Sequence, residues 1–178
     1  MIVIGGILLK RLEYRLLDES KDYPILYYFL DMDELEVAAR FACDYFVKEG
    51  VLYEKSSCAM EVLSCVIYVT KIEEDITRYN ENIRQTEKYI WLEIRHFIEE
   101  AEIYPLVFTY ELRENKEVLL YLQSDYFIWS GQEWQKTSSE IDEDRKVYVL
   151  YAKPADLEEV LRMHKMEKKL KVMKRVRR

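Results

Sequence analysis

Two stretches of the sequence are nearly the same: DYFVKEGVLYEKSS at 44–57 and DYFIWSGQEWQKTSS at 125–139, which begin 81 residues apart. With this offset residues 23–70 align with 104–151 without a gap, and eleven of the 48 aligned pairs are identical. Six of the eleven lie in the first fourteen residues of the quoted stretches, and the matches include a proline and a glycine. A gapless match of this kind predicts a tandem duplication in which both copies share one secondary structure.

Each copy is predicted to be a β-α-β-β module. The run ILYYFL after Pro24 is short and apolar, which is typical of a strand. Residues 31–50, DMDELEVAARFACDYFVKEG, have an acidic first turn, an apolar helical stripe and Gly50 in the position of a C-terminal cap, so they predict a helix. The aligned residues 114–131 are predicted to be helical as well. Two strands follow each glycine: VLYEKSS and CVIYVTK in the first copy, QEWQKTSS and KVYVLYAK in the second.

Helices are predicted before, between and after the modules. RLEYRLLDE at 11–19 resembles WLEIRHFIEE at 91–100, and residues 73–103 carry apolar residues at seven-residue spacing, which form one helical stripe. The expected divisions are an N-terminal element (1–22), the first module (23–72), a connecting helix (73–103), the second module (104–153) and a basic C-terminal helix (155–178). The fold class is therefore α+β. We expect the two modules to pack about an approximate two-fold axis as one unit, because each alone is near the lower size limit for a stable core.

The composition predicts a globular protein of the cytoplasm. Of the 178 residues 49% are hydrophobic, and the formal net charge is −7. Three cysteines, Cys43, Cys58 and Cys65, are an odd number without metal-ligand spacing, so we expect reduced thiols. The opening run MIVIGGILL is too short to span a bilayer, and its charges follow it, whereas a signal peptide carries them first. We expect it to be a buried first element, and we expect no transmembrane segment.

No pattern in the sequence indicates catalysis. There is no G-x-S-x-G, C-x-x-C or H-E-x-x-H motif, and four glycines leave almost no room for a phosphate-binding loop. The sequence therefore predicts no catalytic residues, no metal ligands and no cofactor.

The strand after each matched glycine offers a candidate ligand site. The side chains that share one face at period two are Tyr53, Lys55 and Ser57 in the first copy and Trp134, Lys136 and Ser138 in the second. In the functional interpretation an aromatic ring stacks on a ligand while a lysine and a hydroxyl hold an anion. In the alternative, these are ordinary strands whose aromatic side chain packs and whose lysine extends to solvent.

The last eighteen residues have the opposite charge to the rest of the chain. Residues 161–178 contain nine Lys or Arg and one Glu, a net charge of +8, which leaves −15 for residues 1–160. The segment is also amphipathic, so it could pack on its own acidic body, dock into a groove of a partner, lie on an anionic membrane or contact nucleic-acid phosphates. The basic residues proposed for these contacts are Lys168, Lys169, Lys171, Lys174 and Arg175.

The two predicted hairpin tips differ sharply. SEIDEDR at 139–145 is polar, as a solvated tip should be, whereas CAMEVLS at 58–64 is apolar. Met60 and Leu63 in that tip, and Trp129 where the first copy has Lys48, are therefore candidate contacts for a protein partner. We expect a non-enzymatic interaction or regulatory protein that binds a macromolecule. Two alternatives stay open: a small-ligand or nucleotide sensor with a cleft between the modules, and attachment to nucleic acid or membrane through residues 161–178. Association of identical chains also stays open.

Overall fold

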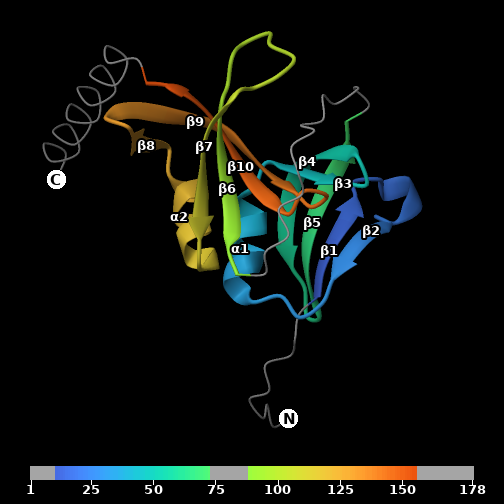
Figure 1. Cartoon of the computed structure of the whole chain (residues 1–178). Helices are drawn as coiled ribbons and strands as arrows, with labels where there is room; N and C mark the ends of the chain where they lie inside the picture. Colours follow the sequence, from blue (N-terminus) through green and yellow to red (C-terminus); the bar gives the residue numbers. More distant parts are fainter. Residues whose placement is uncertain (1–10, 73–87, 156–178) are drawn as a thin grey trace, which may run out of the picture.

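More than half of the described residues lie in strands, since β-branched and aromatic residues recur in short runs between turns. The computed structural model describes residues 11–72 and 88–155, in which ten strands form one mixed sheet accompanied by two α-helices (Figure 1). The predicted α+β class is confirmed at this level. Residues 1–10, residues 73–87 of the predicted connecting helix, and 156–178 of the predicted C-terminal helix lie outside the described residues.

The two halves of the chain follow the same order of elements. The first half contains β1 (Arg11–Leu16), a short 3-10 helix (Glu19–Lys21), β2 (Ile25–Phe29), α1 (Glu34–Ala42), β3 (Tyr45–Lys48), β4 (Val51–Met60) and β5 (Ser64–Lys71). The second half contains β6 (Ile90–His96), β7 (Leu106–Leu112), α2 (Asn115–Gln123), β8 (Tyr126–Trp129), β9 (Gln132–Asp142) and β10 (Val147–Pro154). The order across the sheet is β2-β1-β5-β4-β3-β9-β10-β6-β7, with β8 paired to β9.

One hydrophobic core serves both halves. The helices pack against each other, and their buried side chains belong to the same cluster as residues of β1 and β6. Strand β10 shows how the sheet divides its two faces: Tyr148 and Leu150 point into this main core, whereas Val147 and Val149 belong to a smaller cluster on the other face. The halves are therefore parts of one packed unit.

Both helices are shorter than predicted. Helix α1 begins as expected, because Oδ1 of Asp33 accepts hydrogen bonds from the N–H groups of Leu35 and Glu36 at 2.8 and 2.9 Å. It ends at Ala42, however, and the next residues form β3, which buries Phe46. Phe46 fits the helical stripe in the sequence, but strand pairing on both sides of β3 outweighs that local pattern.

The matched glycines are hairpin residues, and their predicted role as helix caps was wrong. Glu49 and Gly50 have φ of 53° and 71°, and Ser130 and Gly131 have φ of 50° and 77°. Two successive residues with positive φ are the signature of the tight turn that suits the right-handed twist of a two-stranded hairpin. They join β3 to β4 and β8 to β9.

The variant Gly131→Ala is expected to lower the free energy of unfolding by about 1–2 kcal/mol, the usual penalty for a left-handed residue with a Cβ. A Cβ at this position meets no atom within 4 Å, so the backbone conformation alone causes the loss. Urea denaturation measures the effect. Ser130→Gly is the control, since it relieves a left-handed residue in the same turn; an equal loss in both variants would contradict the explanation.

The helices predicted before and between the modules are strands where the structure describes them. Residues 11–16 form β1, which lies between β2 and β5, and residues 90–96 form β6, which lies between β7 and β10. Each half therefore reads β-β-α-β-β-β instead of β-α-β-β. The apolar residues of these segments also fit strands buried on both faces, and pairing with two neighbours decides between the two structures.

The two helices and the strands directly after them keep the 81-residue offset. Helix α2 begins and ends 81 residues after α1, and β8 does so after β3. The pairing of β4 with β5 shifts register at Ser56, and that of β9 with β10 shifts at the aligned Thr137. We call residues 81 apart equivalent positions.

The halves meet through one parallel pairing. Tyr45, Phe46 and Val47 of β3 lie opposite residues 140–142 of β9. A two-fold axis would also place β8 beside β4, but among the described strands β8 pairs with β9 alone. The predicted two-fold arrangement is therefore not seen in the strand pairing.

Candidate functional site

The candidate ligand residues do not share one face of the sheet. Because of the register shift at Ser56, Lys55 lies opposite Val69 whereas Ser57 lies opposite the adjacent Tyr68, so the two side chains point to opposite faces. The second half repeats this, with Lys136 opposite Ala152 and Ser138 opposite Tyr151. Tyr53 and Trp134 are buried in the main core.

The two lysines contact the ends of the helices. Nζ of Lys55 donates to the carbonyl oxygen of Phe41 at 2.7 Å, and Nζ of Lys136 donates to that of Leu122. A cation is favourable at a helix C-terminus, where carbonyl groups lack partners within the helix. These contacts favour the structural interpretation of the repeated lysines, and anion binding by the six residues stays a prediction.

The apolar hairpin tip is exposed, as predicted. Residues 60–63, which we call the tip, join β4 to β5, and the exposed fractions of Met60, Val62 and Leu63 are 62%, 86% and 63%. Trp129 is not part of this surface: it is half-buried in β8, with its ring 5.9 Å from that of Phe108. The candidate residues of the C-terminal segment, Lys168 to Arg175, lie outside the described residues.

Next to the tip, strand β4 has an open edge. Strand β3 pairs with β4 only as far as Glu54, so from Ser57 to Met60 no described strand lies on the side away from β5. The N–H of Glu61 donates to Ser64 across the hairpin, and strand alternation then directs the N–H groups of Cys58 and Met60 outward. An unpaired edge of this kind is a template for pairing with another strand.

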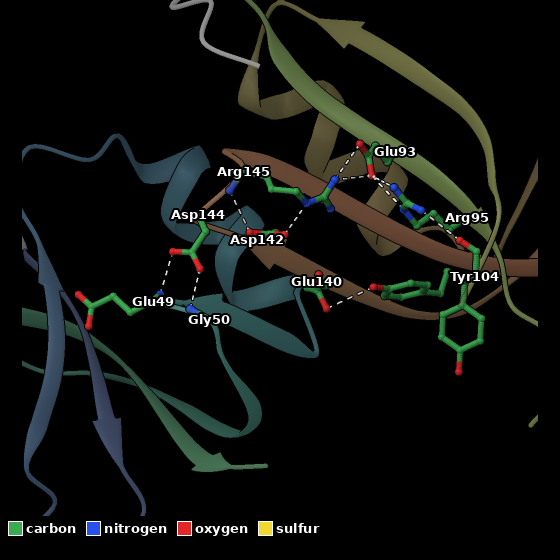
Figure 2. A network of polar contacts seen from close by, with 10 residues as sticks. Glu49, Gly50, Glu93, Arg95, Tyr104, Glu140, Asp142, Asp144 and Arg145 are labelled. Atoms are coloured by element: carbon green, nitrogen blue, oxygen red, sulfur yellow. Dashed lines mark hydrogen bonds and ion pairs between the residues drawn. The ribbon is translucent and has the colours of Figure 1, made fainter. Parts of the chain in front are cut away.

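The equivalent hairpin end of the second half is buried, which corrects the prediction of a solvated tip. Glu140, Asp142, Glu143 and Arg145 are at most 8% exposed. Figure 2 shows Glu140, Asp142 and Arg145 where β9 meets β3 and beside β6, and Glu143 contacts Arg40 of α1, so both halves cover this hairpin end. The composition of EIDED resembles a surface loop, but Asp142 pairs with the nearby Arg145 and Glu143 pairs with Arg40, which is distant in the sequence.

Arg145 connects the hairpin end to β6. Its Nε lies 2.6 Å from Oδ2 of Asp142, and its Nη1 lies 3.0 Å from each carboxylate oxygen of Glu93 (Figure 2). Arg95 donates to the same Glu93 from Nε and Nη2 at 2.9 and 2.8 Å, and from Nη1 to the carbonyl oxygen of Tyr104 at 3.1 Å. Burial opposes the charge of Arg145, but the bonds to Asp142 and Glu93 raise its pKa above the ordinary value.

A second ion pair joins the hairpin end to the helices. Nη1 of Arg40 in α1 lies 2.7 Å from Oε2 of Glu143, and both side chains are buried. Arg40 also contacts Glu36 one turn earlier in α1, at 3.2 Å. Lys146 pairs with Glu143 from the solvent side. Together with Arg145, Arg40 thus ties the end of the β9–β10 hairpin to two other elements.

Glu140 is the carboxyl group without an ion pair among these residues. Burial and the nearby carboxylate of Asp142 raise the pKa of Glu140 to about 7, although Arg145 and the Tyr151 hydroxyl act in the opposite direction. The Tyr151 hydroxyl lies 3.3 Å from Oε2 of Glu140. Shifts of this size occur both at catalytic sites and in structural ion-pair networks. Because these groups are buried and bonded to one another within the second half, we interpret them as structural. Glu140 also lies opposite Tyr45 of β3, at the contact between the halves.

Two aspartates complete that contact. Oδ1 and Oδ2 of Asp144 accept from the N–H groups of Glu49 and Gly50 at 2.8 and 2.7 Å, which fixes the β3–β4 turn against the second half. Oδ2 of Asp44 accepts from the N–H and the hydroxyl of Ser139 at 2.9 and 3.0 Å, and the N–H of Asp44 donates to the Ser139 carbonyl at 2.9 Å.

Sequence reasoning missed the buried charges, although a signal was present. Glu13 and Arg15 in β1 reappear as Glu93 and Arg95 in β6, and each arginine binds the glutamate two residues before it. In the first half Arg15 also binds Glu61, which lies in the tip, with two bonds of 3.0 Å. A glutamate and an arginine two apart on one strand share a face, which argues against the helix predicted there.

This chain matches no known family, and its described residues show neither of two features that would indicate a class of function. Within residues 11–72 and 88–155, no helix has the length and apolar character needed to cross a membrane, and no group of three or more His, Cys, Asp or Glu is placed to hold a metal ion. Comparison with family models, with curated proteins and with solved structures found no match to this chain.

Proposed function

We propose that this chain is a non-enzymatic interaction or regulatory protein of the cytosol, and that a macromolecular partner binds at the tip and the open edge of β4. One observation carries the proposal. The tip is apolar and exposed beside an unpaired strand edge, whereas the equivalent hairpin end is buried against the other half. Contiguous exposed apolar side chains beside a free edge favour pairing with another protein.

We also propose that the halves are copies of one module whose roles have diverged. The equal offsets of α1 and α2 and the register shifts at Ser56 and Thr137 support this proposal. In it, the hairpin end of the second half holds the molecule together, and that of the first half is left free for a partner.

Two alternative functions remain predictions. A small-ligand or nucleotide site between the halves would use Lys55 and Lys136, whose ammonium groups donate to helix carbonyls. Attachment to nucleic acid or to an anionic membrane would use residues 161–178, and it would weaken steeply as the salt concentration rises.

The test is to recover partners from a lysate of the protein's own source cells, with and without nuclease, for three forms of the chain. The double variant Met60→Asp/Leu63→Asp should lose at least about tenfold of a stoichiometric, nuclease-resistant partner, because charges would replace apolar contacts. Ile103→Asp is the matched control, since Ile103 is 57% exposed but lies away from the tip in the sequence. Unchanged recovery by a folded double variant would refute the proposed surface.

A further inference from the structure

We propose that the partner at the open edge of β4 is a second copy of this chain, whose β8 adds to β4 as a parallel strand. This inference rests on the proposed function and names the partner. It follows from a contact that the molecule already contains, the pairing of β3 with β9. Because β8 is equivalent to β3, and β4 is equivalent to β9, the same contact can form between two molecules.

The internal contact provides the geometry. Tyr45 lies opposite Glu140, Phe46 opposite Ile141, and Val47 opposite residue 142. The equivalent pairs place residues 126–128 of one copy opposite 59–61 of the next. Strand β8 uses one edge to pair with β9, as β3 uses one edge to pair with β4, so its other edge is available among the described strands.

Residues buried at the internal contact have exposed apolar equivalents. Ile141 is 4% exposed, whereas its equivalent Met60 is 62% exposed; on the partner strand, half-buried Val47 corresponds to Ile128, which is 72% exposed. The helices show the same difference, since Ala39 of α1 is fully buried and its equivalent Leu120 of α2 is 58% exposed. A second copy placed by the internal geometry would cover these side chains.

Asp125 repeats the aspartate that anchors the internal contact. Its equivalent, Asp44, accepts from the N–H and hydroxyl of Ser139. The backbone carbonyl oxygens of both aspartates accept a hydrogen bond from the following strand. The backbone N–H of Lys55 donates to Asp44, and that of Lys136 donates to Asp125, each at 2.8 Å. The carboxylate of Asp125, in contrast, is exposed and bonds to no other described residue. The residue equivalent to Ser139 is Cys58, whose N–H points out from the open edge.

The equivalence differs at one position in a way that suits an apolar contact. Asp144, which binds the Glu49–Gly50 turn, corresponds to Leu63. A contact between copies would therefore lack those two hydrogen bonds, and the tip would pack its apolar side chains against the neighbouring copy instead.

The proposed assembly is head-to-tail. Within the described part of one molecule β8 does not pair with β4, so the movement that places the first half on the second is not a two-fold rotation. Applying the same movement to the second half therefore places it on the first half of a new copy. Each copy then has one donor, β8, and one acceptor, the open edge of β4. Such heterologous contacts form a ring if the rotation closes and an open chain if it does not.

Disulfide trapping tests the register directly. Cys58 is exposed, while Cys43 and Cys65 are buried. In the internal contact the Ser139 hydroxyl lies 3.0 Å from Oδ2 of Asp44, so Asp125→Cys should place its thiol next to Cys58 of another copy. Oxidation of purified Asp125→Cys with diamide should give a ladder of disulfide-linked dimers and larger species. Lys153→Cys, at another exposed position, should give at most a background level, and Asp125→Cys/Cys58→Ser should give none.

A second measurement needs no new thiol. In sedimentation velocity over a concentration series, Ile128→Asp should weaken self-association at least about tenfold relative to wild type, whereas the control Ile103→Asp should not. A wild-type chain that stays monomeric at every concentration, with no disulfide ladder above that of Lys153→Cys, would overturn the inference. The proposed function would then still stand if Met60→Asp/Leu63→Asp lost a partner from the lysate, and it would fail separately if that variant kept the partner.

Discussion

Replacement of Arg145 by methionine is expected to lower the free energy of unfolding by about 3–5 kcal/mol, which is typical for breaking a buried ion pair by removing one member. Arg145 is 8% exposed, and it is the cation that binds Asp142 while sharing Glu93 with Arg95. Without it the Asp142 carboxylate would remain buried beside Glu140. Methionine keeps much of the side-chain volume, so the loss reports on charge rather than on a cavity.

The matched control is Arg15→Met in the first half. Arg15 also joins a strand glutamate, Glu13, to a hairpin carboxylate, Glu61, but both Arg15 and Glu61 are partly exposed to water. The exposed pair with Glu61 contributes only about 0–1 kcal/mol, and the buried Glu13 keeps Arg11 as a second cation, so this variant should lose less stability. Urea denaturation with circular dichroism measures both. An equal or greater loss for Arg15→Met would contradict the view that the buried ion pairs of Arg145 stabilise the fold more than exposed pairs do.

Glu140→Gln is expected to stabilise the protein at pH 8 by about 3 kcal/mol and to have little effect near pH 4.5. Burial raises the pKa of Glu140 from 4.5 to about 7. The folded state therefore binds this proton more tightly than the unfolded state, and the stability that the protonated carboxyl contributes is lost as the pH rises from about 4.5 to about 7. The magnitude follows from about 1.4 kcal/mol for each pKa unit. Glutamine carries no charge at either pH.

The measurement is the difference in unfolding free energy between variant and wild type at several pH values. Taking this difference cancels the titration of other carboxyl groups, such as that of Glu61, whose pKa is lowered by Arg15. Glu111→Gln, on an exposed position of β7, provides the control and should give a nearly constant difference. A constant difference for Glu140→Gln as well would show that Glu140 is already ionised in the folded protein at pH 5.

Local sequence signals predicted part of the fold. The helix with an acidic first turn, the strands after each glycine and the two hairpin ends all follow from residues close together in the chain. Strands β3 and β8 were not predicted, because the four residues of each strand continue the helical stripe of α1 and α2. What makes β3 a strand is β9, whose partner residues 140–142 lie about 95 positions later. Pairing between residues so far apart in the sequence leaves no local periodicity from which the strand could be predicted.

The candidate site shows the same division. Exposure of Met60 and Leu63 was predicted correctly, because a short hairpin end reaches solvent unless something covers it. The same reasoning failed for Glu140 and Asp142, since β3 and β6, which are distant in the sequence, lie beside this hairpin end. The expectation that the candidate ligand residues share one face failed for a different reason: one extra residue at Ser56 reverses the faces beyond it, and no sequence pattern marks such a bulge.

The parallel joint between β3 and β9 also has a consequence for the protein while it is being made. Strands β1 to β5 are complete once residue 71 has left the ribosome, but the edge of β3 that meets β9 has no partner until residue 142 follows. At about 5–20 residues per second, that delay is on the order of 4–14 seconds. During this time the nascent chain carries an unpaired edge on β3 that the finished protein lacks, in addition to the open edge of β4. Neighbouring nascent chains on one messenger RNA could therefore pair wrongly, and slow translation of the second half would increase that risk.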